Sequence, residues 1–188
     1  MKESSTVQDY LQFISYCLSP DSQSVPSCAE RMDWAGLLQF AEKQSVVGVC
    51  WQGIQRLEDV ANKATEDNVM EWMGAYIQIV RRNAMTNEAV ANLAKFMQSK
   101  DIGFFVFKGQ TIASYYPLPE IRTSGDVDFY VFKKDWERAR LLFEQKYHLT
   151  DEQDGQAWSF VMDRVPCEMH FRTVVFASKS KQHYWDEL

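Results

Sequence analysis

Apolar side chains recur at helical spacing in the first part of the chain. Residues 10–18 place an apolar side chain every three or four positions, and a stretch rich in serine and proline, residues 19–27, ends this pattern. Two further apolar segments, residues 32–40 and 46–57, have the length of short helices. We therefore expect three short helices, of which the second and third pack on each other.

The strongest periodic pattern covers residues 66–100. Its apolar positions define one broad face, which comprises Met70, Met73, Ile77, Val80, Ala84, Val90, Leu93 and Met97. A stretch of about 35 residues is long for one helix of a globular protein, so we expect a break or bend near residues 83–87. Methionine side chains at this spacing are expected to lie in the core.

The periodicity changes after residue 100. Residues 104–107 form a short, wholly apolar run that predicts a buried strand. The elements expected after it are a helix over 110–116, a strand over 127–132, a helix over 133–147, a hairpin turn at Asp154-Gly155 with a strand over 158–162, and a last strand over 167–176. This order predicts an α+β fold in which a helical N-terminal region, residues 1–100, packs on a mixed α/β core, residues 101–188.

Composition and charge narrow the class of protein. The 188 residues are 46% apolar and 24% charged, which is typical of a folded domain, and the net charge of -6 argues against bulk attraction to nucleic acid. Neither a membrane-spanning run nor the apolar segment of a signal peptide occurs, so we expect a cytoplasmic protein with no membrane partner. The four cysteines lack zinc-site spacing and are expected to be free thiols.

Two pairs of polar residues interrupt the apolar strands of the core. Asp126 and Asp128 are two positions apart at the start of one predicted strand, so both side chains project from the same face. Glu168 and His170 have the same spacing on a later, otherwise apolar strand. Carboxylates held this close repel unless a cation shares them, and Mg²⁺ prefers oxygen ligands. If the two strands are neighbours, Glu168 joins Asp126 and Asp128 in a site for one or two metal ions.

A basic residue and a glycine follow the first predicted strand directly. Gly109 permits close approach of the backbone, and the helix that begins there favours an anion at its N-terminus. The residues expected to contact phosphate are Lys108, Gly109, Arg122, Thr123 and Ser124. In the alternative interpretation, Lys108 only caps the end of a strand. Arg122, similarly, can pair with Asp126 or Glu120 in place of phosphate.

Four short motifs follow one another in this part of the chain. They are Phe107-Lys108-Gly109, Tyr116-Pro117-Leu118-Pro119, Arg122-Thr123-Ser124-Gly125-Asp126-Val127-Asp128-Phe129 and Val165-Pro166-Cys167-Glu168-Met169-His170. In this combination and order they resemble the bacterial family of uncharacterised nucleotidyltransferases within the polymerase-β-like nucleotidyltransferase superfamily. The resemblance covers residues 90–176.

The resemblance implies a minimal nucleotidyltransferase fold, in which helices flank a mixed sheet, and a metal-dependent transfer of a nucleotidyl group from a nucleoside triphosphate to an acceptor hydroxyl. By position, Asp126 and Asp128 would bind Mg²⁺, or Mn²⁺ in its place. Glu168 would bind a second metal ion or activate the acceptor, and His170 would orient Glu168 or transfer a proton. The implied nucleotide-binding residues are Lys108, Gly109, Arg122, Ser124 and His170.

The identity of the acceptor is not implied by the resemblance. Since the net charge is negative, a small molecule or a protein is favoured over nucleic acid. Members of the family generally continue beyond the strand with the Glu-x-His motif, so we also expect the 101–188 core to be truncated at its C-terminus.

Three alternatives remain open from the sequence. The first is a catalytically inactive nucleotidyltransferase-like protein that binds a nucleotide or a partner. The second is a glycosyltransferase that uses an Asp-x-Asp pair, although the helical N-terminal region lacks the nucleotide-binding domain that such enzymes normally carry upstream. In the third, Asp126 and Asp128 are surface residues. Glu168 is then paired with Arg122 or Arg172.

Overall fold

A computed structural model describes most of the chain. The described residues are 6–19, 21, 24–57, 65–151, 156–172 and 174–186. The chain divides into two compact units, a first unit of Met1–Asn83 with Tyr116–Thr123 and a second unit of Ala84–Tyr115 with Ser124–Leu188. The expected domain boundary at residue 100 stays a prediction.

The first unit is helical in its described residues. Its elements are α1 (Val7–Cys17), the 3₁₀ helix η1 (Ser27–Arg31), α2 (Trp34–Lys43), α3 (Val47–Gln55), the first half of α5 (Glu66–Ser99) and the 3₁₀ helix η2 (Pro119–Ile121). Helix α1 begins after Thr6 because Thr6 and Asp9 form a capping box, in which each side chain accepts a hydrogen bond from the other residue's backbone N–H. Phe13, Leu37 and Cys50 contribute one buried side chain from each of α1, α2 and α3. The three predicted short helices are confirmed.

Helix α5 is continuous along its length, so the expected break near residues 83–87 is wrong. Asn83 is buried on this helix, and its Nδ2 donates hydrogen bonds to the carbonyl oxygens of Glu120 and Arg122, each at 2.7 Å. Because the side-chain Nδ2 donates to a neighbouring loop, Asn83 does not compete for the backbone of its own helix. Asn83 therefore stays within the helix and holds the loop of Glu120 and Arg122 in place.

The buried stripe of α5 differs from the expected one in the first half of the helix. Met70 and Met73 are exposed, whereas Trp72 is buried and its Nε1 donates a hydrogen bond to the carbonyl oxygen of Trp34 at 3.1 Å. A buried tryptophan removes a large apolar area from water and needs a partner for its N–H, and the first unit supplies both. The expected core position of these two methionines is wrong, while that of Met97 is confirmed.

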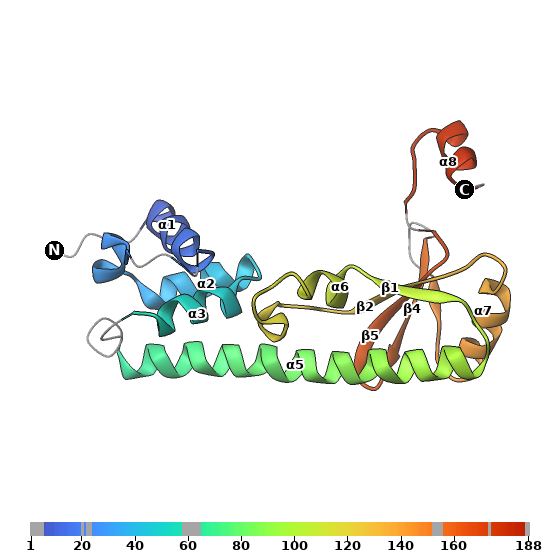
Figure 1. Ribbon diagram of the computed structural model, residues 1–188, viewed down its shortest axis with the longest axis horizontal. Helices are drawn as coiled ribbons and strands as arrows, with labels where there is room; N and C mark the ends of the chain where they lie inside the picture. Colours follow the sequence, from blue (N-terminus) through green and yellow to red (C-terminus); the bar gives the residue numbers. More distant parts are fainter. Residues whose placement is uncertain are drawn as a thin grey trace. The chain divides into compact units, whose positions relative to one another are not determined.

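Within the part of the chain that the structure describes, five strands form one mixed sheet in the second unit (Figure 1). The strands are β1 (Phe104–Phe107), β2 (Val127–Val131), β3 (Thr150–Asp151), β4 (Ala157–Met162) and β5 (Val165–His170). Their order across the sheet is β1-β2-β5-β4-β3. Strands β2 and β5 run parallel, and the other described pairs run antiparallel. The α+β class with a mixed sheet is therefore confirmed.

Alternation along the strands gives the sheet two different faces. Phe129 of β2 and Met169 of β5 belong to a buried cluster that also contains side chains of α7 (Trp136–Glu144) and of the second half of α5, and Figure 1 shows both helices beside the sheet. We call this the helix-covered face. Asp128 and Glu168 neighbour these buried residues in sequence and project from the opposite face, which we call the acidic face.

Two strands differ from the expectation. Strand β1 lies at the edge of the sheet and is not fully buried, since Phe105 is 41% exposed. Phe105 projects from the acidic face, whereas Phe104 and Val106 pack against the buried cluster. The expected strand over 167–176 ends at His170, because the next two backbone N–H groups share one carbonyl oxygen and do not continue the ladder.

A tight turn joins β4 to β5. Its two residues, Asp163 and Arg164, have φ angles of 51° and 67°, and Met162 pairs with Val165 on either side of them. Two left-handed residues in a two-residue loop match the twist of a hairpin. The sequence pattern missed this turn because arginine is uncommon at a left-handed position. The expected turn at Asp154-Gly155 lies outside the described residues.

Two short helices complete the second unit. Helix α6 (Gly109–Ala113) follows β1 and is shorter than the expected helix over 110–116, and α8 (Lys179–Asp186) comes last. In the described ranges, no helix combines the length and the apolar character that crossing a lipid bilayer requires.

Replacing Gly48 by alanine should destabilise the first unit. A Cβ atom at this position of α3 would lie 2.1 Å from the backbone carbonyl oxygen of Ile121, which cannot move aside alone. We expect the free energy of unfolding, measured in urea by circular dichroism, to fall by about 2 kcal/mol. Gly74→Ala is the matched control, because a Cβ there meets nothing within 4 Å. It should gain about 0.5 kcal/mol. An unchanged Gly48→Ala variant would contradict the close contact between α3 and η2.

Candidate functional site

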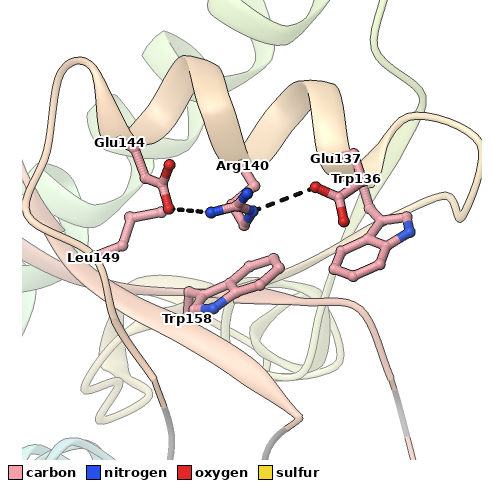
Figure 2. Close-up of a pocket in the computed structure, with 6 residues that line it drawn as sticks. All are labelled: Trp136, Glu137, Arg140, Glu144, Leu149 and Trp158. Atoms are coloured by element: carbon pink, nitrogen blue, oxygen red, sulfur yellow. Dashed lines mark hydrogen bonds and ion pairs between the residues drawn. The ribbon is translucent and has the colours of Figure 1, made fainter.

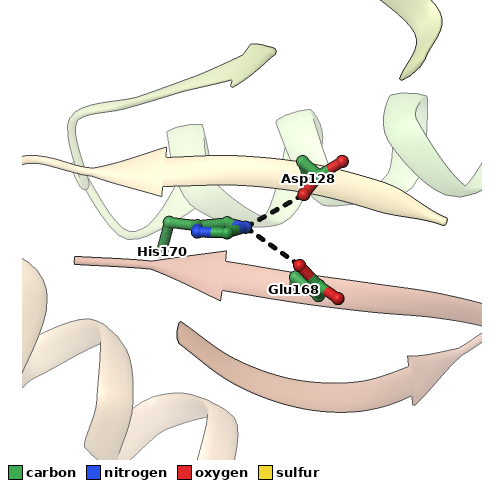
Figure 3. Close-up of side chains that lie close together, drawn as sticks. All are labelled: Asp128, Glu168 and His170. Carbon is green, nitrogen blue, oxygen red and sulfur yellow. Dashed lines mark hydrogen bonds and ion pairs between the residues drawn. The ribbon is translucent and has the colours of Figure 1, made fainter. Parts of the chain in front are cut away.

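The parallel register of β2 and β5 places polar side chains side by side on the acidic face. Asp128 pairs with Glu168 across the two strands, and Tyr130 pairs with His170. Because side chains alternate along a strand, Glu168 and His170 project from the same face of β5, next to Asp128 (Figure 3). Side chains from two strands that are distant in sequence therefore meet at one place.

The three side chains are in direct contact, and we call Asp128, Glu168 and His170 the acidic group. His170 Nε2 lies 2.9 Å from Asp128 Oδ1 and 3.1 Å from Glu168 Oε2. One ligand atom from each residue lies within 4.8 Å of the others. Two carboxylates and an imidazole at this spacing form a donor set that suits a divalent cation.

Lys108 adds a cation to the acidic group. Its Nζ lies 2.6 Å from Asp128 Oδ1, the same oxygen that contacts His170. Its backbone, between β1 and α6, has φ 54° and ψ -115°, a region that favours glycine. A residue with a side chain in this conformation is strained by about 1 kcal/mol or more. A lysine where the backbone favours glycine points to a role for its ammonium group.

Burial and neighbouring charges shift the two carboxyl groups in opposite directions. Burial opposes the ionisation of Asp128, but hydrogen bonds from His170 and Lys108 outweigh it and hold the pKa of Asp128 below its usual value. Burial raises the pKa of Glu168, and the charges of Asp128 and Asp126 raise it further. Burial also opposes the charge of Lys108, yet contact with Asp128 leaves the pKa of Lys108 raised. The ionised form of Asp128 and the charged form of Lys108 are thus favoured, whereas Glu168 beside them loses its proton less readily than an ordinary glutamate.

The described residues include buried polar atoms without a hydrogen-bond partner, and two of these are His170 Nδ1 and Ser124 Oγ. Nε2 of His170 faces two carboxylate oxygens, whereas Nδ1 is buried without a contact. A buried polar atom without a partner costs about 1–3 kcal/mol, so native proteins usually pair such atoms with water or a ligand. The residues present therefore fit a polar ligand at the acidic face.

A comparison with protein families identifies the class of the chain. A family model described as "Uncharacterised nucleotidyltransferase" matches residues 30–188. The chain belongs to this family. Searches of the curated proteins and of the solved structures each found no match. The acidic group lies within the matched segment, as do all four motifs singled out in the sequence.

The structure brings together two of the three carboxylates predicted as a metal triad. Asp128 and Glu168 meet, and His170 completes the group. Asp126 is half-buried and lies outside the group, although its charge contributes to the raised pKa of Glu168. It precedes the first residue of β2, so the ladder with β5 does not fix its side chain. The assignment of catalytic residues and metal ligands stays a prediction.

The predicted phosphate contacts are distributed over both units. Lys108, Gly109 and Ser124 belong to the second unit with the acidic group, whereas Arg122 and Thr123 belong to the first. Gly109 is buried and begins α6. The roles of these residues toward a nucleotide stay predictions.

Two contacts of the acidic group were missed by reasoning from the sequence. The ladder between β1 and β2 pairs Phe107 with Asp128, which brings the next residue, Lys108, to the same carboxylate. The ring of Phe107 also meets the ring of His170 edge-on, with 5.0 Å between the centroids. The position of a lysine directly after an apolar strand is the sequence signal for the Lys108 contact. This signal was not sufficient, because the sequence does not show which strands are neighbours in the sheet.

A pocket of about 400 Å³ lies elsewhere on the second unit (Figure 2). Its lining residues are Trp136, Glu137, Arg140, Glu144, Leu149 and Trp158. Trp158 pairs with Met169 across the sheet, so it projects from the helix-covered face. Arg140 is already paired with two glutamates of its own helix, and Trp158 stacks on Trp136. The charged groups of this pocket are paired and its two tryptophan rings are stacked on each other, so we place the candidate functional site on the acidic face.

Glycine and alanine at position 108 should separate the backbone role of Lys108 from that of its side chain. Both variants lose the ammonium group that contacts Asp128, but glycine adopts φ 54° and ψ -115° without strain. We expect Lys108→Gly to be more stable than Lys108→Ala by about 1 kcal/mol in chemical unfolding at neutral pH. Equal stabilities of the two variants would contradict a strained backbone at this position.

Glu168→Gln should stabilise the protein at neutral pH. The raised pKa of Glu168 means that its ionised form destabilises the fold above that pKa, and this cost disappears as the pH falls below its usual value. Glutamine keeps an acceptor for His170 and removes the charge, so we expect the melting temperature to rise by about 2 °C at pH 7.5 and not at pH 4. Glu137→Gln, at an exposed side chain of α7, is the control and should give no rise. A gain that is equal at both pH values would contradict charge repulsion as its cause.

Proposed function

We propose that the chain is a metal-dependent nucleotidyltransferase that moves a nucleotidyl group from a nucleoside triphosphate to an acceptor hydroxyl. The observation that carries the proposal is the acidic group, whose ligand atoms lie within 4.8 Å of one another in a member of a nucleotidyltransferase family. On its four motifs we further propose that it belongs to the polymerase-β-like superfamily, and that it acts in the cytoplasm.

Mg²⁺ is the metal that we propose, with Mn²⁺ as an alternative. Asp128 and Glu168 would hold it, and Asp126 would join them from the start of β2. Carboxylate oxygens suit Mg²⁺, and the nearby imidazole of His170 is a ligand that Mn²⁺ also accepts. When bound, one or two such ions would offset the charge of the phosphates and align the attacking and leaving oxygens.

Lys108 has a second role in this proposal. In the structure its Nζ neutralises Asp128, and half of the side chain remains exposed. When Asp128 binds a metal ion in place of Lys108, the ammonium group of Lys108 is free to contact a phosphate oxygen of the bound nucleotide. The buried hydroxyl of Ser124, which lacks a partner among the described residues, is a further donor for phosphate. Gly109 and Arg122 remain candidate contacts from the sequence.

The reaction is an in-line displacement at the α-phosphorus. The acceptor oxygen forms a bond to this phosphorus, the bond to the bridging oxygen of the β-phosphate breaks, and pyrophosphate leaves. Where Glu168 activates the acceptor in place of holding a second metal ion, it takes the proton of the acceptor hydroxyl. His170 orients Glu168 through the hydrogen bond at Oε2.

The acceptor that we propose is a small molecule or a protein. The chain carries 20 basic and 26 acidic residues, so a long polyanion would meet net repulsion. The family match alone does not distinguish between the two classes of acceptor.

A second candidate function is a nucleotide-binding protein without turnover. The observation that favours it is that Lys108 and His170 already contact the same oxygen of Asp128, which neutralises this carboxylate without a metal ion. Such a protein would bind a nucleoside triphosphate with little dependence on divalent cations.

The metal-dependent transfer can be tested with Asp128→Asn, which keeps the shape of the side chain and removes its charge. The protein is incubated with Mg²⁺ or Mn²⁺ and each α-labelled nucleoside triphosphate, and transfer to itself or to components of a cell extract is measured. We expect the variant to lose about 100-fold in transfer rate, whereas Glu137→Gln retains it. Binding of the nucleotide is measured in parallel, with and without metal.

The outcomes separate the two candidate functions. Metal-dependent binding and transfer that both depend on Asp128 would support the nucleotidyltransferase. Binding that is the same with and without metal and in Asp128→Asn, with no transfer, would overturn the metal site and support the binding protein.

A further inference from the structure

A row of aromatic side chains lies beside the acidic group on the acidic face. The ladder between β1 and β2 pairs Phe107 with Asp128 and Phe105 with Tyr130, so the rings of β1 project from the same face as the carboxylates. Phe132 follows the last residue of β2 and extends the row. We call Phe105, Phe107, Tyr130 and Phe132 the aromatic strip.

The rings of the aromatic strip contact one another and the acidic group. The ring centroid of Phe105 lies 5.2 Å from that of Tyr130 and 6.0 Å from those of both Phe107 and Phe132. At one end of the strip, the ring of Phe107 meets His170 with 5.0 Å between the centroids. The aromatic strip is therefore continuous with the candidate metal site.

The strip presents apolar rings to solvent. Phe105 is 41% and Phe132 is 43% exposed, although the helix-covered face of the same sheet has its own buried cluster. The core therefore does not require these rings. Contiguous exposed apolar side chains beside convergent polar groups are typical of a ligand-binding surface.

Charge selects the kind of ligand that fits. At one end of the strip are the carboxylate of Asp128 and the ammonium group of Lys108, whose Nζ lies 5.2 Å from the centre of the Phe107 ring. The strip itself consists of three phenylalanines and one tyrosine, which are uncharged at neutral pH. A complementary ligand has a highly charged end, which binds metal and lysine, and a flat uncharged end. A nucleoside triphosphate has both.

The spacing of the strand fits the length of that ligand. Side chains two positions apart on a strand are separated by about 7 Å. The pair of Phe105 and Tyr130 therefore lies about one sugar's length beyond the pair of Phe107 and Asp128. With the phosphates at Lys108 and the acidic group, the ribose would pass Phe107 and the base would reach Phe105.

We propose that the aromatic strip is the platform on which the base of the nucleoside triphosphate stacks. This inference rests on the proposed function and specifies its substrate. Three of the four rings of the strip are phenylalanines, which offer no hydrogen-bond groups, so recognition depends more on stacking than on the edge of the base. The protein accordingly prefers purine over pyrimidine nucleoside triphosphates and distinguishes weakly between adenine and guanine.

The test compares two probes on the full chain, ATP and inorganic tripolyphosphate, each titrated calorimetrically with Mg²⁺. Tripolyphosphate reports on the phosphate site alone, whereas ATP adds the base. We expect Phe105→Ala to weaken ATP binding about 10-fold and to leave tripolyphosphate binding unchanged. Phe105→Trp should restore ATP binding. The control is Leu141→Ala, an exposed aliphatic residue of α7, which should change neither affinity.

The outcomes distinguish this proposal from the proposed function. If tripolyphosphate binds through Asp128 but ATP binds no more tightly and is insensitive to Phe105→Ala, the base platform is overturned and the phosphate site stands. If ATP binding depends on Phe105 while tripolyphosphate does not bind, the platform stands and the metal site falls. If neither probe binds, both are overturned.

A second copy of the chain is the other occupant that the test detects. Sedimentation of the wild type, Phe105→Ala and Phe132→Ala reports their oligomeric state. Dissociation of a dimer by these substitutions, without an effect on ATP affinity, would identify the strip as a contact between copies and overturn the base platform.

Discussion

The parallel pairing of β2 with β5 is the interaction on which the candidate site depends. Its register sets Asp128 against Glu168, and like charges directly opposite one another destabilise a sheet. His170 and Lys108 reduce that cost because both contact Asp128 Oδ1. A hydrophobic pair at these positions would give an equally stable or a more stable sheet. The carboxylates are therefore better explained by chemistry at this face than by stability, and the family to which the chain belongs is consistent with that chemistry.

The packing of the helix-covered face compensates for the repulsion between the carboxylates on the acidic face. On the helix-covered face, Phe129 and Met169 are almost fully buried with side chains from α5 and α7. The same two strands place Asp128 and Glu168 on the other face, one residue away in each case. Backbone hydrogen bonds of the ladder thus position the carboxylates, and a tightly packed layer supports the strands from behind. A site built on strands is held more rigidly than one built on loops.

Reasoning from the sequence predicted what depends on local pattern and missed what depends on tertiary partners. The spacing of two between Glu168 and His170 predicted that they share a face, which the structure confirms. The same rule failed to bring Asp126 into the acidic group, because it lies before the first ladder pair of β2. The break expected from the length of the pattern does not occur near Asn83, whose Nδ2 donates to the carbonyl oxygens of a loop that is distant in sequence. Local pattern does not contain these partners, so the pairing of strands and the fate of buried polar groups required the structure.

For Lys108, neither the backbone conformation nor the tertiary partner of the side chain was predicted from the sequence. Glycine would adopt the backbone conformation of residue 108 without strain, yet the chain has lysine there and glycine at the next position. The residue type at position 108 therefore conflicts with the local backbone preference. A strained residue of this kind is retained when the contribution of its side chain exceeds the strain energy of its backbone. Here the side chain provides a positive charge 2.6 Å from the most buried carboxylate of the acidic group and 5.2 Å from the nearest ring of the aromatic strip. The strained residue therefore stands where the charged and the uncharged parts of a nucleotide would meet, which is the position from which one cation can contact the phosphates while the base remains on the rings.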